Sequence, residues 1–204
     1  DVNQDSQSEI IFGDYDGVIR AFDISGQQIE NSVYPYETDD QIWGSPAMAD
    51  MDLDGHNDFV FASSDKHLYF FDSMGFNGSV NCESFLIGSP VIGNIDDDDE
   101  LEVIIGGFSG GDGRKLFAFN HDMTPVLGFP ILIGEKIKKG ASLADFNNNG
   151  KDDIVFGTDS DNIYLILDDG SVADGFPFAT NGKIHSSPAI LDINGNITII
   201  AGSN

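Results

Sequence analysis

The stretch from residue 44 to residue 62 reads GSPAMADMDLDGHNDFVFA and contains the pattern that decides the fold. Small residues come first, an acidic loop with one glycine follows, and an apolar run closes the stretch. Short apolar runs that are rich in aromatic and β-branched residues and bounded by Gly, Asp and Asn are typical of β-strands. A second such run, LYFFD at residues 68–72, follows after a short turn. The pattern therefore predicts short strands joined by an acidic loop.

The same order of small residues, acidic loop and apolar runs recurs along the whole chain. Repeats start near residues 1, 44, 88, 140 and 186, and their acidic loops begin at 1, 50, 94, 145 and 192. The distance between successive loops stays between 44 and 51 residues, although the first and last copies are partial. A period this regular indicates a repeat protein.

Each repeat is predicted to contain strands only, because no apolar run is long enough for a typical helix. The first strand uses small residues, as expected where strands crowd near an axis. A weaker fourth strand is expected at GFPI (128–131) and GFPF (175–178). Four short strands repeated about every 40 to 50 residues are the blade pattern of a β-propeller. We therefore expect an all-β propeller of four-stranded blades that covers residues 1–204 as one region.

The number of repeats bears on whether the ring closes. The chain has about four repeats plus a partial one, and the first strand of the last copy could complete the first blade. The last copy also has a second strand, which fits poorly in a closed four-blade ring. This leftover strand favours part of a larger propeller.

The chain is strongly acidic, with 35 Asp and Glu against 9 Lys and Arg and a formal net charge of −26. This balance argues against a nucleic-acid partner and against anionic membrane surfaces, which it would repel. Hydrophobic residues make up 40%, which is compatible with a folded core. No apolar run approaches the roughly 18 residues of a membrane-inserted helix. Cys82 is the only cysteine, which excludes an internal disulfide and a Cys-based zinc site.

The acidic loops have the residues that a calcium ion needs. Calcium prefers six to eight oxygen ligands at about 2.3–2.6 Å. In the loop that begins at residue 50, acids occupy the first, third, fifth and ninth positions, and Gly55 permits the tight turn. The seventh residue would add its backbone carbonyl. The predicted ligands of this loop, the strongest site in the chain, are Asp50, Asp52, Asp54, His56 and Asp58.

Three further loops keep the same offsets. The loop at 145 has fewer charges and is expected to bind calcium more weakly, through Asp145, Asn147, Asn149, Lys151 and Asp153. The loop at 94 has Asp99 where glycine normally sits, and Asp tolerates the left-handed conformation better than most residues. Its predicted ligands are Asn94, Asp96, Asp98, Glu100 and Glu102. The N-terminal loop would use Asp1, Asn3, Asp5, Gln7 and Glu9.

An alternative explanation of these loops is that they are Asp/Asn/Gly turns whose side chains satisfy their own backbone. One isolated loop would not decide between a turn and a metal site. Four loops with the same offsets, each before an aliphatic strand, favour about three to four Ca²⁺ ions. The last copy, at Asp192, is shorter and lacks the closing acid, so no metal is expected there.

The pattern Ser-Pro-Ala-x-x-Asp-x-Asp-x-Asp-Gly, followed by an aliphatic strand, resembles the FG-GAP/VCBS repeats of integrin-α-type propellers and many secreted bacterial proteins. The resemblance covers essentially all 204 residues. It implies a propeller with calcium loops, and it is specific for the repeat but not for function.

No constellation of catalytic residues stands out. The four histidines lack metal-ligand spacing, and the serines near Asp residues recur at one repeat position, which favours a structural role. Two irregular stretches are candidate surface features: the Gly-rich insertion at 106–113, and residues 31–43, which contain the sole tryptophan, Trp43. Exposed aromatics there could stack on sugars or anchor a protein, although packing against strands is the favoured role.

These observations favour a non-enzymatic, extracellular or cell-surface scaffold used for adhesion or for binding a protein or carbohydrate ligand. Millimolar calcium outside the cell would fill even weak loops. One alternative is an accessory or catalytic propeller of a secreted polysaccharide-degrading enzyme. Another is a structural subunit of an extracellular assembly that self-associates through unpaired blade edges.

Overall fold

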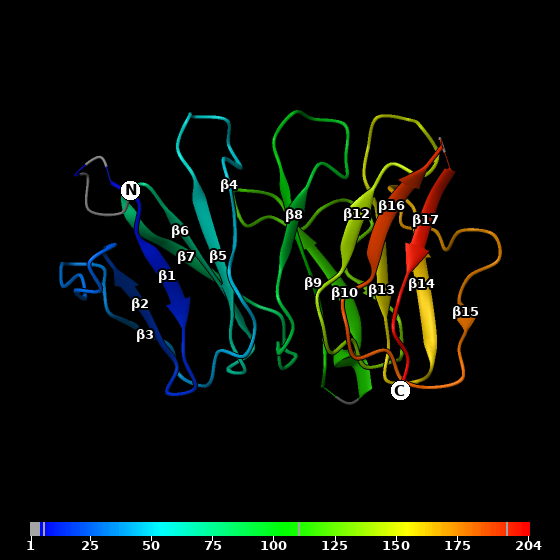
Figure 1. Ribbon diagram of the computed structural model, residues 1–204, viewed down its shortest axis with the longest axis horizontal. Helices are drawn as coiled ribbons and strands as arrows, with labels where there is room; N and C mark the ends of the chain where they lie inside the picture. Colours follow the sequence, from blue (N-terminus) through cyan, green and yellow to red (C-terminus); the bar gives the residue numbers. More distant parts are fainter. Residues whose placement is uncertain (1–4, 6, 110, 195) are drawn as a thin grey trace.

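The computed structural model describes residues 5, 7–109, 111–194 and 196–204. Over these residues the protein is all-β, and its only helix is a single 3₁₀ turn at Gly111–Gly113. No helix in the described part is long and apolar enough to cross a membrane. The strands form five antiparallel sheets that stand side by side in a row (Figure 1). The predicted all-β propeller architecture is confirmed.

Each full sheet is a four-stranded meander in which strands that follow one another in sequence pair with each other. The first sheet contains β1 (Ile10–Gly13), β2 (Val18–Phe22) and β3 (Tyr36–Glu37). The second contains β4 (Ala47–Ala49), β5 (Asp58–Ala62), β6 (His67–Asp72) and β7 (Gly75–Asn81). The third contains β8 (Val91–Gly93), β9 (Glu102–Gly106), β10 (Lys115–Phe119) and β11 (Ile131–Leu132). The fourth contains β12 (Ser142–Ala144), β13 (Asp153–Gly157), β14 (Asn162–Ile166) and β15 (Phe178–Ala179), and the fifth β16 (Ala189–Ile193) and β17 (Asn196–Ile200). The weak fourth strands predicted at 128–131 and 175–178 are present as β11 and β15, but each strand begins at the last residue of its predicted segment.

The hydrophobic core lies between neighbouring sheets. In β5, Phe59 and Phe61 pack toward the first sheet, whereas Val60 and Ala62 pack toward the third. Successive side chains of a strand point to opposite faces, so a strand buried on both faces is apolar at every position. This explains why the central strands read as continuous apolar runs and do not alternate with polar residues.

The inner strands approach one another closely along one edge of the row. A Cβ on Gly44 would overlap the backbone of Gly88, and one on Gly88 would press against Lys139 beside Gly140. The Ser45 N–H donates a hydrogen bond of 3.0 Å to Ser89 Oγ. The expectation that small residues mark a crowded axis is confirmed, because larger side chains would push these strands apart.

The row of sheets does not close into a ring within the described residues. β16 pairs only with β17, and β1 pairs only with β2. The first and last sheets lie at opposite ends of the row (Figure 1). β16, the first strand of the last repeat, therefore does not complete the first blade. The arrangement is that of a partial propeller.

Candidate functional site

The loop between β4 and β5 brings three of its predicted ligands together. Carboxylate oxygens of Asp50, Asp52 and Asp54 all lie within 4.8 Å of one another. Asp50 Oδ2 accepts the Gly55 N–H at 3.0 Å, whereas Asp50 Oδ1 is buried without a hydrogen-bond partner. A buried carboxylate oxygen without a donor is costly unless a cation or water completes it. The residues present therefore fit a hard divalent cation.

The closing acid of this loop lies outside that group of three. Asp58 Oδ2 accepts the Met51 N–H at 2.9 Å and so ties the end of the loop to its start. Burial is the main cause that raises the pKa of Asp58. A cavity of about 40 Å³ beside the loop is lined by Asp52, Asp58 and Asp72 among others, and this volume is comparable to that of one water molecule or ion.

Asp72 is a residue that the spacing of the acidic loops did not reveal. It ends β6, and Asp23 and Asn120 directly follow β2 and β10, whereas Asp168 is the second residue after β14. A polar residue that recurs after the third strand of each repeat was the available signal. The strand brings it back to the acidic loop because adjacent antiparallel strands return the chain to the same end.

The loop between β8 and β9 forms a second acidic group, with Asp96, Asp98 and Glu102 oxygens within 4.8 Å of one another. Here the closing acid joins the group, and a glutamate is one methylene longer than the aspartate at position 58. Asn94 Oδ1 and Glu102 Oε1 are buried without hydrogen-bond partners. Both oxygens are suitable calcium ligands.

The same loop corrects one expectation about its backbone. Leu53 and Gly55 of the first loop have positive φ angles of 59° and 93°, and Asn148 and Gly150 of the third loop have 58° and 91°. The φ angle of Asp99 is not positive, so the left-handed conformation expected there is absent. An acidic side chain in place of glycine makes that conformation more costly, and the loop turns without it.

Glu102 is the most strongly perturbed acid of the loops. Its side chain is 1% exposed, and its Oε2 accepts the Ile95 N–H at 2.7 Å. Burial raises the pKa of Glu102 to about 7, and the charges of Asp96 and Asp98 act in the same direction. A divalent cation would relieve both the burial of the charge and this repulsion.

The loop between β12 and β13 already contains a protein cation. Lys151 Nζ lies 3.1 Å from Asp168 Oδ2 and 2.7 Å from Asp97 Oδ1 of the preceding loop. Burial alone would raise the pKa of Asp168, but hydrogen bonds from Lys151, Asn149 and Asn147 lower it overall. The seventh residue of this loop thus contributes an ammonium group, which reduces the need for a metal charge.

The other parts of this loop are held mainly by backbone donors. Asp145 accepts the N–H groups of Asn149 and Gly150 at 3.0 and 2.8 Å. Both oxygens of Asp153 accept backbone N–H groups, from Phe146 at 2.9 Å and from Asp168 at 3.0 Å. This loop matches the alternative of a self-satisfied turn more closely than the other two.

The terminal loops are described only in part. Asp1 and Asn3 lie outside the described residues, while Asp5 accepts the Gln7 N–H at 2.8 Å. Glu9 is half-buried just before β1. Metal binding at the N-terminal loop, and its absence at Asp192, stay predictions.

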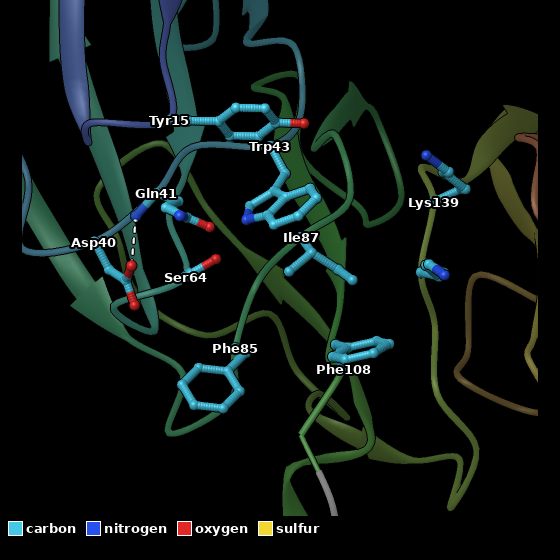
Figure 2. Close-up of a pocket in the computed structure, with 10 residues that line it drawn as sticks. Tyr15, Asp40, Gln41, Trp43, Ser64, Phe85, Ile87, Phe108 and Lys139 are labelled. Atoms are coloured by element: carbon cyan, nitrogen blue, oxygen red, sulfur yellow. Dashed lines mark hydrogen bonds between the residues drawn. The ribbon is translucent and has the colours of Figure 1, made fainter.

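A pocket of about 570 Å³ lies at the opposite end of the sheets from the acidic loops. Its apolar lining comes from the β1–β2 turn and from the segments between β3 and β4, between β7 and β8 and between β9 and β10. The side chains are Tyr15, Trp43, Phe85, Ile87 and Phe108 (Figure 2). Trp43 is 53% exposed and makes an edge contact with Tyr15, with ring centroids 4.8 Å apart. The expectation that the 31–43 aromatics pack against strands holds for Tyr34, which is 3% exposed, but not for Trp43.

The polar lining of the pocket comes from two sides. Asp40 and Gln41 lie on one side with Ser64, and Lys139 lies across the pocket from them (Figure 2). Lys138 also lines the pocket. Backbone hydrogen bonds fix these segments: the Ser64 N–H donates to the Gln41 carbonyl at 2.8 Å. The Gly-rich insertion also contributes, since Phe108 belongs to it and donates its N–H to the Phe85 carbonyl at 3.0 Å. The pocket is therefore built from ordered connections of several blades.

The meander sheets, the inter-sheet core and the repeated acidic loops define a repeat protein of the β-propeller class. No family model matches the chain, and no curated protein matches it in sequence. Solved propeller-type structures do match in fold. The C-terminal domain of Pseudomonas aeruginosa PilY1 is similar in fold, with a TM-score of 0.71 and 15% identity. The match includes 99% of this chain and 54% of that domain.

Two further structures are similar in fold. The chain matches BBS1N, crystallised in complex with ARL6DN, over 97% of its own length with a TM-score of 0.66 and 10% identity. It matches BamB from Moraxella catarrhalis over 97% of its length with a TM-score of 0.59 and 13% identity. It spans 57% and 55% of those two chains. The chain therefore covers little more than half the length of these structures, and the likeness is one of fold.

Proposed function

We propose that this chain is a calcium-stabilised propeller scaffold of the FG-GAP/VCBS kind that binds a protein or carbohydrate ligand outside the cell, without catalysis. The observation that carries the calcium part is the set of buried loop oxygens without donors, at Asp50, Asn94 and Glu102. Carboxylate and amide oxygens held close together around a tight turn suit calcium better than softer metals.

The scaffold part of the proposal is supported by the positions of the acidic loops and the aromatic pocket at opposite ends of the sheets. The acidic loops tie the first strand of a blade to the second, so cations there would stabilise blades and leave the opposite end free for a ligand. That end holds the aromatic pocket with its exposed Trp43. Among the structures of similar fold, BBS1N was crystallised with a protein partner, which is compatible with a binding role for this architecture.

An extracellular location follows from the proposed calcium chemistry. Loops with mixed Asp and Asn ligands bind calcium in the range that millimolar external calcium would fill. The low calcium of a cytosol would leave the weaker loops empty, and the acids in them would then repel one another. We therefore place the scaffold at the cell surface or outside the cell.

Calorimetric titration and thermal unfolding of the chain test the proposal together. We expect two or more Ca²⁺ ions per chain and a higher midpoint in calcium than in excess chelator, because a ligand of the native state alone stabilises it by mass action. At 100 times Kd, each site would add about 2.7 kcal/mol. Equal midpoints in calcium and chelator, with no binding heat, would refute the calcium scaffold.

A further inference from the structure

The aromatic pocket exposes side chains that the core does not need. Trp43, Tyr15 and Phe85 are 53%, 62% and 45% exposed. Aromatic residues that cluster in an exposed pocket are the type that dominates binding energy at protein interfaces. The volume of about 570 Å³ lies within the range of about 300–1,000 Å³ that is usual for ligand pockets.

Basic residues gather around this pocket although the chain as a whole is acidic. Lys138 and Lys139 line it, and neither forms an ion pair in the part of the chain that the structure describes. Lys66 and Lys136 lie over the rings of Phe85 and Phe108, at 5.5 and 4.7 Å from the ring centroids. Four of the nine basic residues of the chain therefore surround one pocket.

Two acids that flank the lining segments are engaged by other groups. Asp65 accepts the Tyr69 hydroxyl at 2.6 Å, and Glu135 accepts hydrogen bonds from Thr158 and Asn162. Asp40 is the one carboxylate among the lining residues. The pocket is thus a locally cationic, aromatic surface on a protein of net charge −26.

We propose that this pocket binds a short extended segment of a partner protein in which a large apolar side chain is flanked by acidic residues. The apolar side chain would lie against Trp43, Ile87 and Phe108, and the acidic residues would pair with Lys138 and Lys139. Unpaired ammonium groups beside an aromatic pocket complement this combination in both charge and polarity. The inference depends on the scaffold role proposed above and assigns its binding site.

Two other occupants fit the pocket less well. A saccharide needs many directed hydrogen bonds, yet Ser64 is only 8% exposed and Asp40 Oδ1 already accepts the Gln41 N–H. The aromatic lining could pack against a sugar ring as well as a peptide side chain, so the shortage of free hydrogen-bonding groups and the two lysines are what favour an acidic peptide. A second copy of this chain would bring another net charge of −26 and be repelled.

Selection from a display library of random 12-residue peptides tests the inference in calcium buffer. The full chain is the bait, and the triple variant Trp43→Ala/Lys138→Glu/Lys139→Glu removes peptides that bind elsewhere. We expect enriched peptides with an aromatic or aliphatic residue among Asp and Glu. Enrichment of basic or purely polar peptides, or no enrichment that depends on the pocket, would overturn the proposal.

A synthetic copy of the enriched peptide then gives affinities against single variants. Trp43→Ala and Lys139→Glu are expected to weaken binding at least tenfold, and added salt is expected to weaken it further. Lys183→Glu is the matched control, since Lys183 is exposed, carries the same charge and does not line the pocket. Equal loss in Lys139→Glu and Lys183→Glu would show only a general charge effect and overturn the assigned site.

Two controls separate this inference from the proposed function. A panel of oligouronates is titrated in parallel, and pocket-dependent binding of these sugars without peptide binding would assign the pocket to carbohydrate and refute the peptide proposal. Calcium melts of Trp43→Ala should match those of the wild type. If peptide binding fails while the calcium shift persists, the pocket assignment is wrong and the calcium scaffold stands.

Discussion

The backbone N–H of Ile95 donates a hydrogen bond of 2.7 Å to Glu102 Oε2, and the second oxygen of Glu102 is buried without a partner. The same bond recurs from Met51 to Asp58 and from Phe146 to Asp153. In each of these three blades the closing acid therefore links the start of its loop to the second strand. Glu102 is engaged through one oxygen only, so it can connect a metal to the backbone of its blade, whereas both oxygens of Asp153 already accept backbone N–H groups.

The closing acids predict how stability depends on pH when calcium is removed. Burial raises the pKa of Asp58, Glu102 and Asp153, and that of Glu102 rises from 4.5 to about 7. The folded chain then holds protons more tightly than the unfolded chain, so this contribution is complete below about pH 4 and is lost as pH rises through 7. We expect the urea midpoint in chelator to fall between pH 5 and 7.5.

Calcium should reverse that trend, because cation binding favours the ionised carboxylates. Urea unfolding at the two pH values, in calcium and in chelator, measures the four midpoints. Glu102→Gln in chelator should show a smaller fall than the wild type. A chelated wild type that is more stable at pH 7.5 than at pH 5 contradicts the assignment.

Removing one carboxylate of the first loop should remove one calcium ion. Asp50→Asn keeps a side-chain oxygen that can accept the Gly55 N–H but loses the charge, so calcium affinity at this loop should fall at least tenfold. Titration calorimetry would count the sites. Asp174→Asn is the matched control because Asp174 is exposed and lies outside the loops, and its calcium binding should equal that of the wild type.

A glycine at the end of the second strand packs against an isoleucine that precedes the next blade. A Cβ at Gly106 would overlap the side chain of Ile137, and the same relationship joins Gly13 to Ile42. Gly106→Ala should therefore destabilise the fold by about 1–3 kcal/mol through overpacking. Ile137→Ala makes room but leaves a cavity in the core. In a double-mutant cycle, the double variant should be more stable than the sum of the single changes predicts, and strict additivity would argue against the contact.

The single cysteine should be inert in the native state. Cys82 is 6% exposed, and burial raises its pKa to about 12. Because the thiolate is the reactive form, a thiol reagent at pH 8 should modify the folded chain far more slowly than the chain in urea. Labelling followed by mass spectrometry measures both rates. Equal rates would show that the core between the second and third sheets, which contains Cys82, opens readily.

The fold was largely predictable because the repeat is local. Each blade is a meander of neighbouring strands, so the apolar runs, the turns and the period along the chain were enough to place almost every strand. The short strands β11 and β15 directly follow the Gly-Phe-Pro segments, whereas β3, inside the stretch described as irregular, and β7 were not predicted. Whether the sheets would close could not be decided in this way, because closure depends on pairing between the two ends of the chain.

The candidate sites divide along the same line. The sequence by itself determined the acidic loops, since their predicted ligands lie within nine residues and local geometry brings Asp50, Asp52 and Asp54 together. Only the tertiary structure decided that Asp72 and Asp168 approach these loops and that Lys151 pairs with Asp97 of another blade. The pocket, too, could be found only in the tertiary structure, because Tyr15, Trp43, Phe108 and Lys139 come from separate blades. The spacing of a repeat predicts contacts within a unit, whereas contacts between units depend on how the sheets pack.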